Sequence, residues 1–454
     1  MKKSALSLVF LIFIAIGCNK KLDISPQNSL TPDQITTAED VTALVFGAYS
    51  TLQNANAYGE MYNTIPELLF NEGDILWAGT FAQYRDLENK EQTAANGIVY
   101  QSWANSYQTI LAVNLAIKNI NLLEEDDKPS IEGESRFIRG LVYLQLVNMF
   151  AKPYSFGNTA SNPGVPLILE PIAGYDPQRD KRPRASVEEV YTQIISDLTF
   201  AEANLPLEAD DYRASKGAAQ AVLARVYLAQ EKYAEAAAAA NEVIESGVYE
   251  LTPSYDAAFN NVASSTEDVF AIQQTSQSNS GTSNFGMIAF YSTYPVGRGE
   301  IQVTEEYLER FEATDERGQF AYEGESISGS PGFLTTKWSE PYRAIPVIRL
   351  AEMYLTRAEA NLRSGVAQVG PNSPVQDVNV VRARAGASPY AVLTAEDVVN
   401  ERFLELAFEG DRFLTMKRLK MDVGSIPYDD PILILPIPQR ETDLGNALPQ
   451  NEGY

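Results

Sequence analysis

Histidine is missing from this sequence of 454 residues, and cysteine occurs only once, at Cys18. Without histidine the chain lacks the usual general base, the Ser–His and Cys–His nucleophile pairs and the commonest metal ligand. Catalysis would have to rest on carboxylates, lysine or tyrosine, and we expect neither a cofactor nor a metal site. A single cysteine forms no disulfide within the chain, so stability must come from packing.

Basic residues are also scarce. The chain has 35 Lys and Arg against 60 Asp and Glu, which gives a formal net charge of −25. A field of this sign repels polyanions, so we expect no nucleic acid partner and no attraction to an anionic lipid surface.

A short apolar run stands at the N-terminus, at residues 5–16, after the basic start Met1-Lys2-Lys3. As a helix this run would span about 18 Å, which is short of the roughly 30 Å hydrocarbon core of a bilayer. The pattern therefore predicts a cleaved signal peptide over residues 1–17 rather than a permanent membrane span.

The signal peptide ends in Ala15-Ile16-Gly17-Cys18, which resembles a bacterial lipobox. This motif predicts that Cys18 becomes the diacylated first residue of the mature chain. Several acyl chains would then give stable attachment to outer-membrane lipid through a tether of residues 18–32. The alternative is an ordinary leader followed by an unmodified thiol.

Helical periodicity dominates the remaining sequence. Residues 215–230 and 233–246 predict two helices joined by a tight link, in which small residues and tyrosines alternate as in a tetratricopeptide unit of about 34 residues. One such pair cannot bury its apolar faces alone, so further pairs are expected. Helical spacing recurs over residues 37–53, 65–70, 100–123, 135–150, 186–204, 344–364, 376–385 and 394–412.

The segments between these helices are irregular. They predict insertions at residues 71–97, 151–185 and 252–343 and an extended C-terminus at 425–454. The expected fold class is mainly α: a tetratricopeptide-like helix-pair superhelix with an irregular, partly β, loop-rich portion. We expect one domain, residues 33–454, whose helical scaffold comprises residues 33–150, 186–251 and 344–412.

Several blocks of the sequence are similar to one known family and follow its order. They are Cys18 through Pro26, Trp103 with Tyr107, Ile110 and Asn114, Glu134 through Tyr143, Gly164-Val165-Pro166-Leu167, Arg349 through Ala360, Val381 through Gly386, Glu401 through Arg412 and Leu435 through Glu441. Over nearly the whole mature chain they resemble the SusD/RagB-like outer-membrane lipoproteins of Bacteroidetes.

The resemblance implies a SusD-like scaffold whose irregular portion binds ligand, on a lipoprotein anchored in the outer membrane and facing the cell exterior. It also implies a partner, a SusC-like TonB-dependent transporter, over which the protein acts as a hinged lid. The implied role is capture of a nutrient, an oligosaccharide or other glycan in most members and a peptide in some, without catalysis.

Two groups of carboxylates have the composition of an acid–base site. Residues 401–412 interleave Glu401, Glu405, Glu409 and Asp411 with two arginines, and we interpret this block as a structural ion-pair network. Glu67, Glu72 and Asp74 could form a glycosidase-like pair, although helix-end solvation and loop hydrogen bonding are the favoured interpretation. The acidic run at residues 124–127 is interpreted as a solvated turn.

Aromatic residues outside the periodic helices are the candidate ligand contacts. They fall in aperiodic segments, and related proteins carry ligand-contacting aromatics in loops at comparable points. In this chain the candidates are Trp77, Phe81, Tyr84, Phe290, Tyr291 and Tyr294. Trp103 and Trp338 are expected to be packed.

Three functions stay open at this point. The first is surface capture of a glycan for a transporter, the second is an extracellular hydrolase that uses two carboxylates, and the third is a protein-interaction scaffold of the tetratricopeptide kind. The resemblance favours the first.

Overall fold

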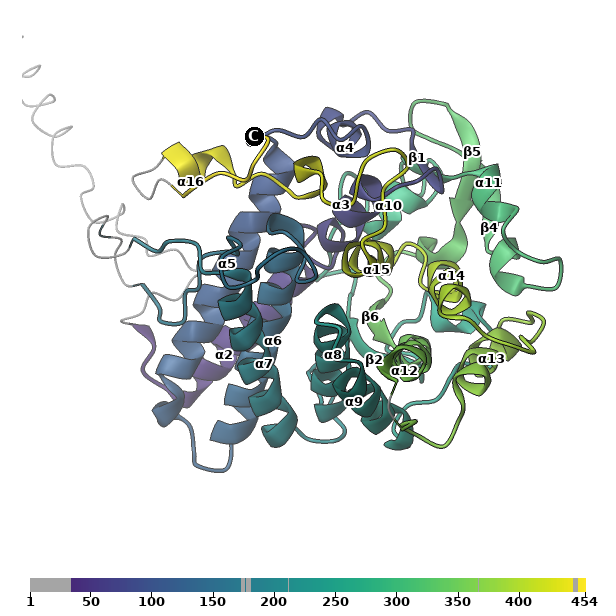
Figure 1. The fold of residues 1–454 in the computed structure, drawn as a ribbon. Helices are drawn as coiled ribbons and strands as arrows, with labels where there is room; N and C mark the ends of the chain where they lie inside the picture. Colours follow the sequence, from purple (N-terminus) through teal and green to yellow (C-terminus); the bar gives the residue numbers. More distant parts are fainter. Residues whose placement is uncertain (1–33, 173–175, 177–180, 211, 366, 444–447) are drawn as a thin grey trace, which may run out of the picture.

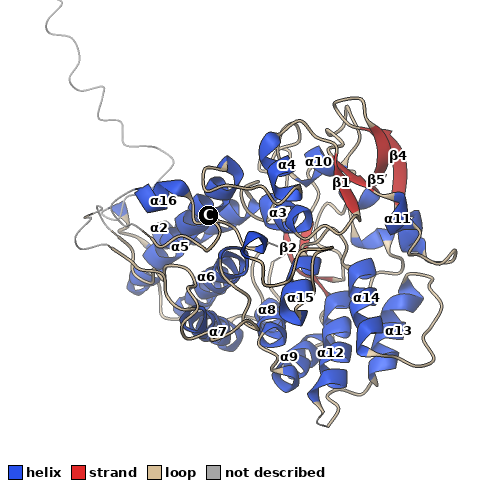
Figure 2. Ribbon diagram, turned by 45° about the horizontal axis from the view of Figure 1, so that its top comes forward, coloured by secondary structure: helices blue, strands red, loops and turns tan. Residues whose placement is uncertain are grey.

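The computed structural model describes residues 34–172, 176, 181–210, 212–365, 367–443 and 448–454. The predicted signal peptide, the tether and Cys18 lie outside these described residues. Helices build most of the molecule, and the strands lie mainly on one side of it (Figures 1 and 2). The mainly α fold class predicted from the sequence is confirmed.

The helices of the first half form a row (Figure 1), in which α2 packs on α5, α5 on α6, α6 on α7, α7 on α8 and α8 on α9. The α8–α9 unit confirms the helix pair predicted from the small residues and tyrosines. The bounds are α2 Ala38–Gln53, α3 Met61–Leu69, α4 Ala82–Glu88, α5 Gly97–Lys118 followed by the 3-10 turn Ile120–Leu122, α6 Lys128–Phe150, α7 Val187–Asn204, α8 Lys216–Ala229 and α9 Tyr233–Glu245.

The row continues into the second half, where α9 packs on α12 and α12 packs on both α13 and α14. These helices are α12 Leu350–Ser364, α13 Pro374–Arg384 and α14 Ala395–Glu405, and they are followed by α15 Asp411–Leu419. α15 turns back to contact α3 and α8, which ties the end of the scaffold to its beginning.

Local sequence signals explain where the helices begin and how closely they pack. Ser186 and Glu189 form a capping box, in which each side chain accepts a hydrogen bond from the other residue's backbone N–H. A Cβ added at Gly140 of α6 would lie 3.1 Å from a Leu198 carbon of α7. A small residue at this point therefore allows the close approach of the two helices, as the sequence pattern predicted.

Within the described part of the chain the strands form two antiparallel sheets. One has the order β1 (Ile75–Trp77), β3 (Ile301–Val303), β5 (Pro331–Thr335) and β4 (Ala321–Glu325), and the other pairs β2 (Asp268–Ile272) with β6 (Ile345–Arg349). The insertion over residues 252–343 is thus partly β, as expected. It also holds α10 Met287–Tyr291, α11 Glu305–Leu308 and the 3-10 turns Asp256–Ala258, Glu316–Gln319 and Thr336–Trp338.

Three sequence predictions of local structure were wrong. Residues 71–97 are not one long loop, because they contain β1 and α4, two elements too short to give a periodic signal. Residues 344–364 begin as strand β6 before α12. The single helix predicted over residues 394–412 is broken into α14 and α15, because Phe408 and Gly410 take φ angles of 65° and 78°, which an α-helix does not tolerate.

The C-terminal segment lies along the helical row, apart from the 3-10 turn Pro431–Leu433 and α16 (Gln439–Asp443). The backbone N–H of Leu435 donates to Met149 O at 2.8 Å, and the Asn451 amide donates to Phe150 O at 2.9 Å. The segment therefore closes over the end of α6, in agreement with the expected extended packing.

Candidate ligand-binding face

Three of the six candidate aromatic residues form a buried stack beneath the first sheet. Trp77 at the end of β1 lies parallel to Tyr84 of α4, with ring centroids 4.9 Å apart, and Phe290 of α10 packs edge-on against both rings. All three side chains are buried. In this conformation they present no ring face to a ligand, and the stack holds the two insertions together.

Tyr291, the neighbour of Phe290, is fully buried as well and packs near Phe408. The prediction that these aromatics contact ligand is narrowed by burial to Phe81 and Tyr294. Trp103 and Trp338 are buried too, which confirms that they are packed.

Phe81 and Tyr294 each lie close to an exposed apolar residue. Phe81, only partly buried, lies parallel to Phe285, with centroids 6.3 Å apart and an interplanar angle of 6°. Tyr294 is 51% exposed and Val296, on the same turn, is 53% exposed. Exposed apolar residues gathered in this way are typical of a binding surface.

Arg298 links the chain segments that carry these residues. Its guanidinium carbon lies 4.6 Å from the Phe81 centroid, and its nitrogens donate to Asn284 Oδ1, Thr80 Oγ1 and Glu300 Oε1 at 3.2, 2.9 and 2.7 Å. The fixed guanidinium joins residues 80–81 to residues 284–285. We call Phe81, Phe285, Tyr294, Val296 and Arg298 the aromatic face.

The hairpin between β4 and β5 supports the aromatic face from a third segment. The N–H of Tyr294 donates to Glu325 O at 3.1 Å, and the N–H of Ile327 donates to Arg298 O at 2.7 Å. Gly299, at φ +58°, lies so close to the hairpin that an added Cβ would be 2.6 Å from Glu325 O. The turn that carries Tyr294 is therefore held by backbone contacts.

Sequence reasoning missed Phe285 and Arg298. Phe285 could have been found because it is an isolated aromatic that follows the polar, Ser-rich run at residues 275–284. For Arg298 no comparable signal exists, because its partners come from two distant segments.

Below the aromatic face, Glu60 is buried at the start of α3. Its carboxyl accepts a hydrogen bond from Tyr84 Oη at 2.6 Å and lies 3.5 Å from the N–H of Gly286. Burial raises the pKa of the Glu60 carboxyl to about 8, against the lowering effect of these hydrogen bonds. The carboxyl is neutral at pH 7 and connects both insertions to the scaffold.

The carboxylates considered for hydrolysis are engaged elsewhere. Glu67 accepts from the N–H of Gly410 at 2.9 Å, and Glu72 lies 2.8 Å from Arg412. Asp74 is ion-paired with Arg412 and Arg310. Hydrogen bonding and ion pairing of these groups agree with the favoured interpretation, but the predicted helix-end solvation was wrong for Glu67 and Asp74, which are buried. Residues 124–127 are exposed as predicted.

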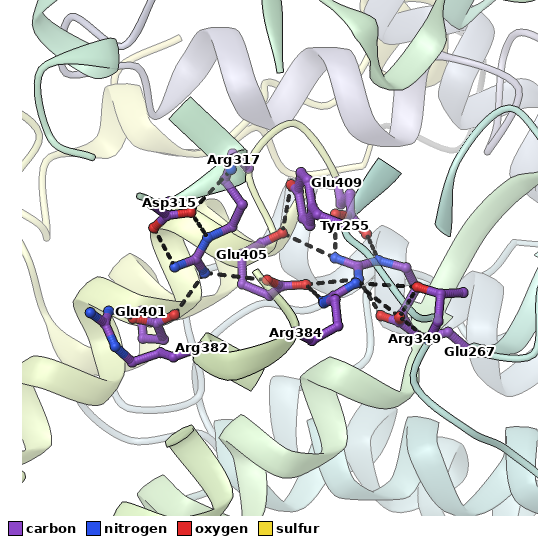
Figure 3. Close-up of polar contacts among 12 residues, drawn as sticks. Tyr255, Glu267, Asp315, Arg317, Arg349, Arg382, Arg384, Glu401, Glu405 and Glu409 are labelled. Atoms are coloured by element: carbon purple, nitrogen blue, oxygen red, sulfur yellow. Dashed lines mark hydrogen bonds and ion pairs between the residues drawn. The ribbon is translucent and has the colours of Figure 1, made fainter. Parts of the chain in front are cut away.

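Three of the four carboxylates of residues 401–412 lie in one buried ion-pair network, much of which is labelled in Figure 3, and the fourth, Asp411, pairs with Arg402. In the described part of the chain the network joins five cations to six carboxylates: Arg317, Lys337, Arg349, Arg382 and Arg384 with Glu267, Glu312, Asp315, Glu401, Glu405 and Glu409. Charges this well paired fit a structural role, and the predicted ion-pair network is confirmed.

Two kinds of feature are absent from the described residues. No cluster of three or more His, Cys, Asp and Glu side chains there could hold a metal ion. Likewise, none of the described helices is both long and apolar enough to span a membrane.

Fold and site together define a class of protein, which has a tetratricopeptide-like scaffold with buried ion pairs and carries aromatic side chains at the surface of its irregular insertions. Comparisons with known proteins agree. A family model described as "Starch-binding associating with outer membrane" matches residues 20–228, and one described as "SusD family" matches residues 334–429. The chain belongs to the SusD/RagB-like family.

Individual relatives are distant but similar over most of their length. SusD-like protein P2 of Formosa agariphila is 25% identical over the whole of both chains, and starch-binding protein SusD of Bacteroides thetaiotaomicron is 25% identical over 71% of this chain and 72% of its own. The crystal structure of a putative sugar binding protein from Bacteroides vulgatus is 25% identical, with a TM-score of 0.80 over 92% of this chain and 99% of that one. Surface glycan-binding protein A from Bacteroides fluxus is 22% identical, with a TM-score of 0.76 over 92% of this chain and all of that one.

Proposed function

We propose that this protein captures a glycan at the aromatic face and passes it to a SusC-like TonB-dependent transporter in the outer membrane. The observation that carries the proposal is the parallel ring pair of the partly buried Phe81 and the exposed Phe285, with Arg298 fixed beside it, in a chain of the SusD/RagB-like family. Relatives named as starch-binding and glycan-binding support the ligand class.

The chemistry of the aromatic face suits a sugar. Flat rings cover the apolar C–H surface of a pyranose, while Asn284 and Arg298 offer hydrogen bonds to its hydroxyls. Covering one ring face, about 60 Å², contributes about 1.5 kcal/mol at roughly 25 cal/mol/Å². Two or three rings must offset the cost of immobilising the ligand, so a single site should bind in the micromolar range or more weakly.

Weak binding fits a protein that hands its cargo on. In the proposed arrangement Cys18 carries the lipid anchor on the cell exterior, and the protein covers the mouth of the barrel as a lid. The family description, which includes association with the outer membrane, supports this location.

The capture role is tested by replacing the exposed rings. The full chain, purified in detergent, is screened against an array of neutral glucan, mannan, galactan and xylan oligosaccharides beside their sulfated and uronic counterparts. The triple variant Phe81→Ala/Phe285→Ala/Tyr294→Ala should lose at least tenfold in affinity for the glycan that the wild type retains.

Two results of this screen would reject the proposal. A wild-type chain that retains no glycan would reject capture. Binding unchanged in the triple variant would reject the aromatic face. The matched control is Val262→Ala/Val392→Ala, because these two side chains are 71% and 79% exposed but lie outside the face.

A further inference from the structure

A pocket of about 410 Å³ is lined by residues none of which belongs to the aromatic face. Its walls come from three separate parts of the chain: α2, Tyr212 in the segment before α8, and residues 271–278 at the end of β2. The volume falls within the range of about 300–1,000 Å³ that is typical of small-molecule sites.

Three aromatic residues line this pocket, of which Tyr49 is buried and the other two are unusually exposed. Phe46 is 43% exposed and Tyr212 is 44% exposed, with ring centroids 6.2 Å apart at an interplanar angle of 65°. The guanidinium of Arg213 lies 5.9 Å from the Phe46 centroid, and its Nε donates to Glu134 at 3.0 Å. The Phe46 ring is therefore contacted by both Tyr212 and the ion-paired Arg213, while both rings keep a large surface exposed to solvent.

The polar part of the lining consists of hydroxyl and amide groups. The Gln53 amide donates to Gln273 O at 2.6 Å and accepts from Ser278 Oγ at 2.8 Å. Ser50 and Thr275 add hydroxyls, and none of the described lining residues is charged. Neutral donors and acceptors beside rings match a ligand that has hydroxyls and apolar C–H faces.

Beyond its first turn, which carries the exposed Glu39, helix α2 has an uncharged solvent face around the pocket. Its exposed residues there are Ala43, Phe46, Gly47 and Ser50, and the sequence carries no charged residue from 41 to 59 in a chain of net charge −25. Surface helices normally carry charges on their solvent face. A neutral ligand that binds next to this uncharged face would not remove water from a charged side chain.

The neighbouring surface restricts the charge of that ligand. A second pocket, of about 420 Å³, shares Ala271 with the first, and its charged lining consists of Glu208, Asp210, Asp268 and Arg213. Arg213 is already ion-paired with Glu134, whereas Glu208 and Asp210 are exposed and would repel a sulfate or a uronic acid placed at Phe46 and Tyr212. Charge therefore favours a neutral occupant.

We propose that the Phe46–Tyr212 pocket is a second carbohydrate subsite, which binds a neutral stretch of the same polysaccharide chain that the aromatic face holds. This inference rests on the proposed function. The segment of residues 278–285 contributes to both sites, because Ser278 lines the pocket and Phe285 belongs to the aromatic face. Two weak subsites on one rigid scaffold raise the affinity for a long chain above that for a short one.

The test compares long and short ligands. Full-length wild type, the pocket variant Phe46→Ala/Tyr212→Ala and the triple variant of the aromatic face are titrated with hexasaccharides, with their parent neutral polysaccharides and with the sulfated or uronic counterparts of these, taken from the glycans that the array identifies. We expect the pocket variant to lose about tenfold or more in affinity for the polysaccharide and to keep hexasaccharide binding within about twofold. Its thermal unfolding should match the wild type, because both side chains lie at the surface.

Three other results would each contradict a different part of this proposal. Polysaccharide binding within twofold of wild type in the pocket variant would overturn the second subsite and leave the proposed function standing. A loss confined to sulfated or uronic glycans would overturn the neutral class. A wild-type chain that binds no glycan at all would overturn the proposed function and the subsite with it.

Discussion

Arg349, the last residue of β6, and Glu405, the last residue of α14, form an ion pair inside the molecule. Arg349 Nη1 lies 2.9 Å from Glu405 Oε1, and both side chains are 0% exposed. Arg349 also reaches Glu267 at 2.5 Å and Glu409 at 2.8 Å. Burial would raise the pKa of Glu405, but Arg384 and Arg349 outweigh it and hold that pKa below its ordinary value. This pair ties the second sheet to the end of the scaffold.

Removing one partner of this pair should be costly. Glu405→Gln removes one of the negative charges that compensate the buried guanidinium of Arg349. Arg349→Met removes the cation that three carboxylates share in a site closed to water. We expect each variant to lower the free energy of unfolding by about 3–5 kcal/mol, measured by urea denaturation. The control is Glu125→Gln, whose 87% exposed side chain pairs with Lys128 at the surface, with an expected change under about 1 kcal/mol. Equal effects of the buried and the surface variants would contradict the structural role of the network.

Glu60 should make stability depend on pH. Its pKa is raised to about 8 in the folded chain from an ordinary value of 4.5, so the folded state holds a proton that the unfolded state releases. The stabilising contribution is complete below about pH 4.5 and is lost as the pH rises to about 8, by at most about 1.4 kcal/mol per pH unit.

Glu60→Gln tests this dependence because the amide stays neutral. Other buried acids, such as Glu67, titrate in the same range, so the quantity to measure is the difference in unfolding free energy between variant and wild type. This difference should shift in favour of the variant as the pH rises from 5 to 8. A difference that stays constant over that range would rule out a neutral Glu60 in the folded state.

Two helix glycines should respond in opposite directions to alanine. In α2, a Cβ at Gly47 would meet nothing within 4 Å among the described residues, so Gly47→Ala should stabilise by about 0.5–1 kcal/mol through helix propensity. In α8, a Cβ at Gly217 would lie 2.6 Å from Tyr249 Oη, so Gly217→Ala should destabilise by about 1–3 kcal/mol. Thermal unfolding of both variants decides the matter, and a shift of the same sign in both would show that the helix packing is not as described.

Cys18→Ala tests the anchor. If Cys18 carries the acyl chains, the variant should leave the membrane fraction, partition into the aqueous phase of a detergent phase separation and fail to incorporate labelled palmitate. Wild-type and variant chains that fractionate alike would contradict lipid attachment at this residue.

Much of the scaffold could be predicted because helix periodicity, caps and small-residue spacing are local signals. Ser186 with Glu189 fixes the start of α7, and the Tyr227–Tyr233 region defines the α8–α9 pair from neighbouring residues alone. The break between α14 and α15 escaped prediction because Phe408 adopts a left-handed conformation that glycine, not phenylalanine, usually signals.

The candidate site was predictable only in outline. Loop aromatics could be identified because they do not recur at helical spacing. Whether each one is buried depends on residues more than 200 positions away in the sequence. Trp77 is covered by Phe290, whereas Phe81 is paired with Phe285 near the surface. Nothing in the neighbouring sequence distinguishes these two outcomes.

The central claim is that this protein holds a glycan and leaves it chemically unchanged. The most direct measurement is the chain-length distribution, by mass spectrometry, of an array-identified oligosaccharide recovered from the wild-type protein after prolonged incubation. The account predicts that the ligand is retained by the wild type, lost by the triple variant of the aromatic face and recovered at its original length. Recovery of shortened products, abolished by Glu72→Gln or Asp74→Asn, would contradict it.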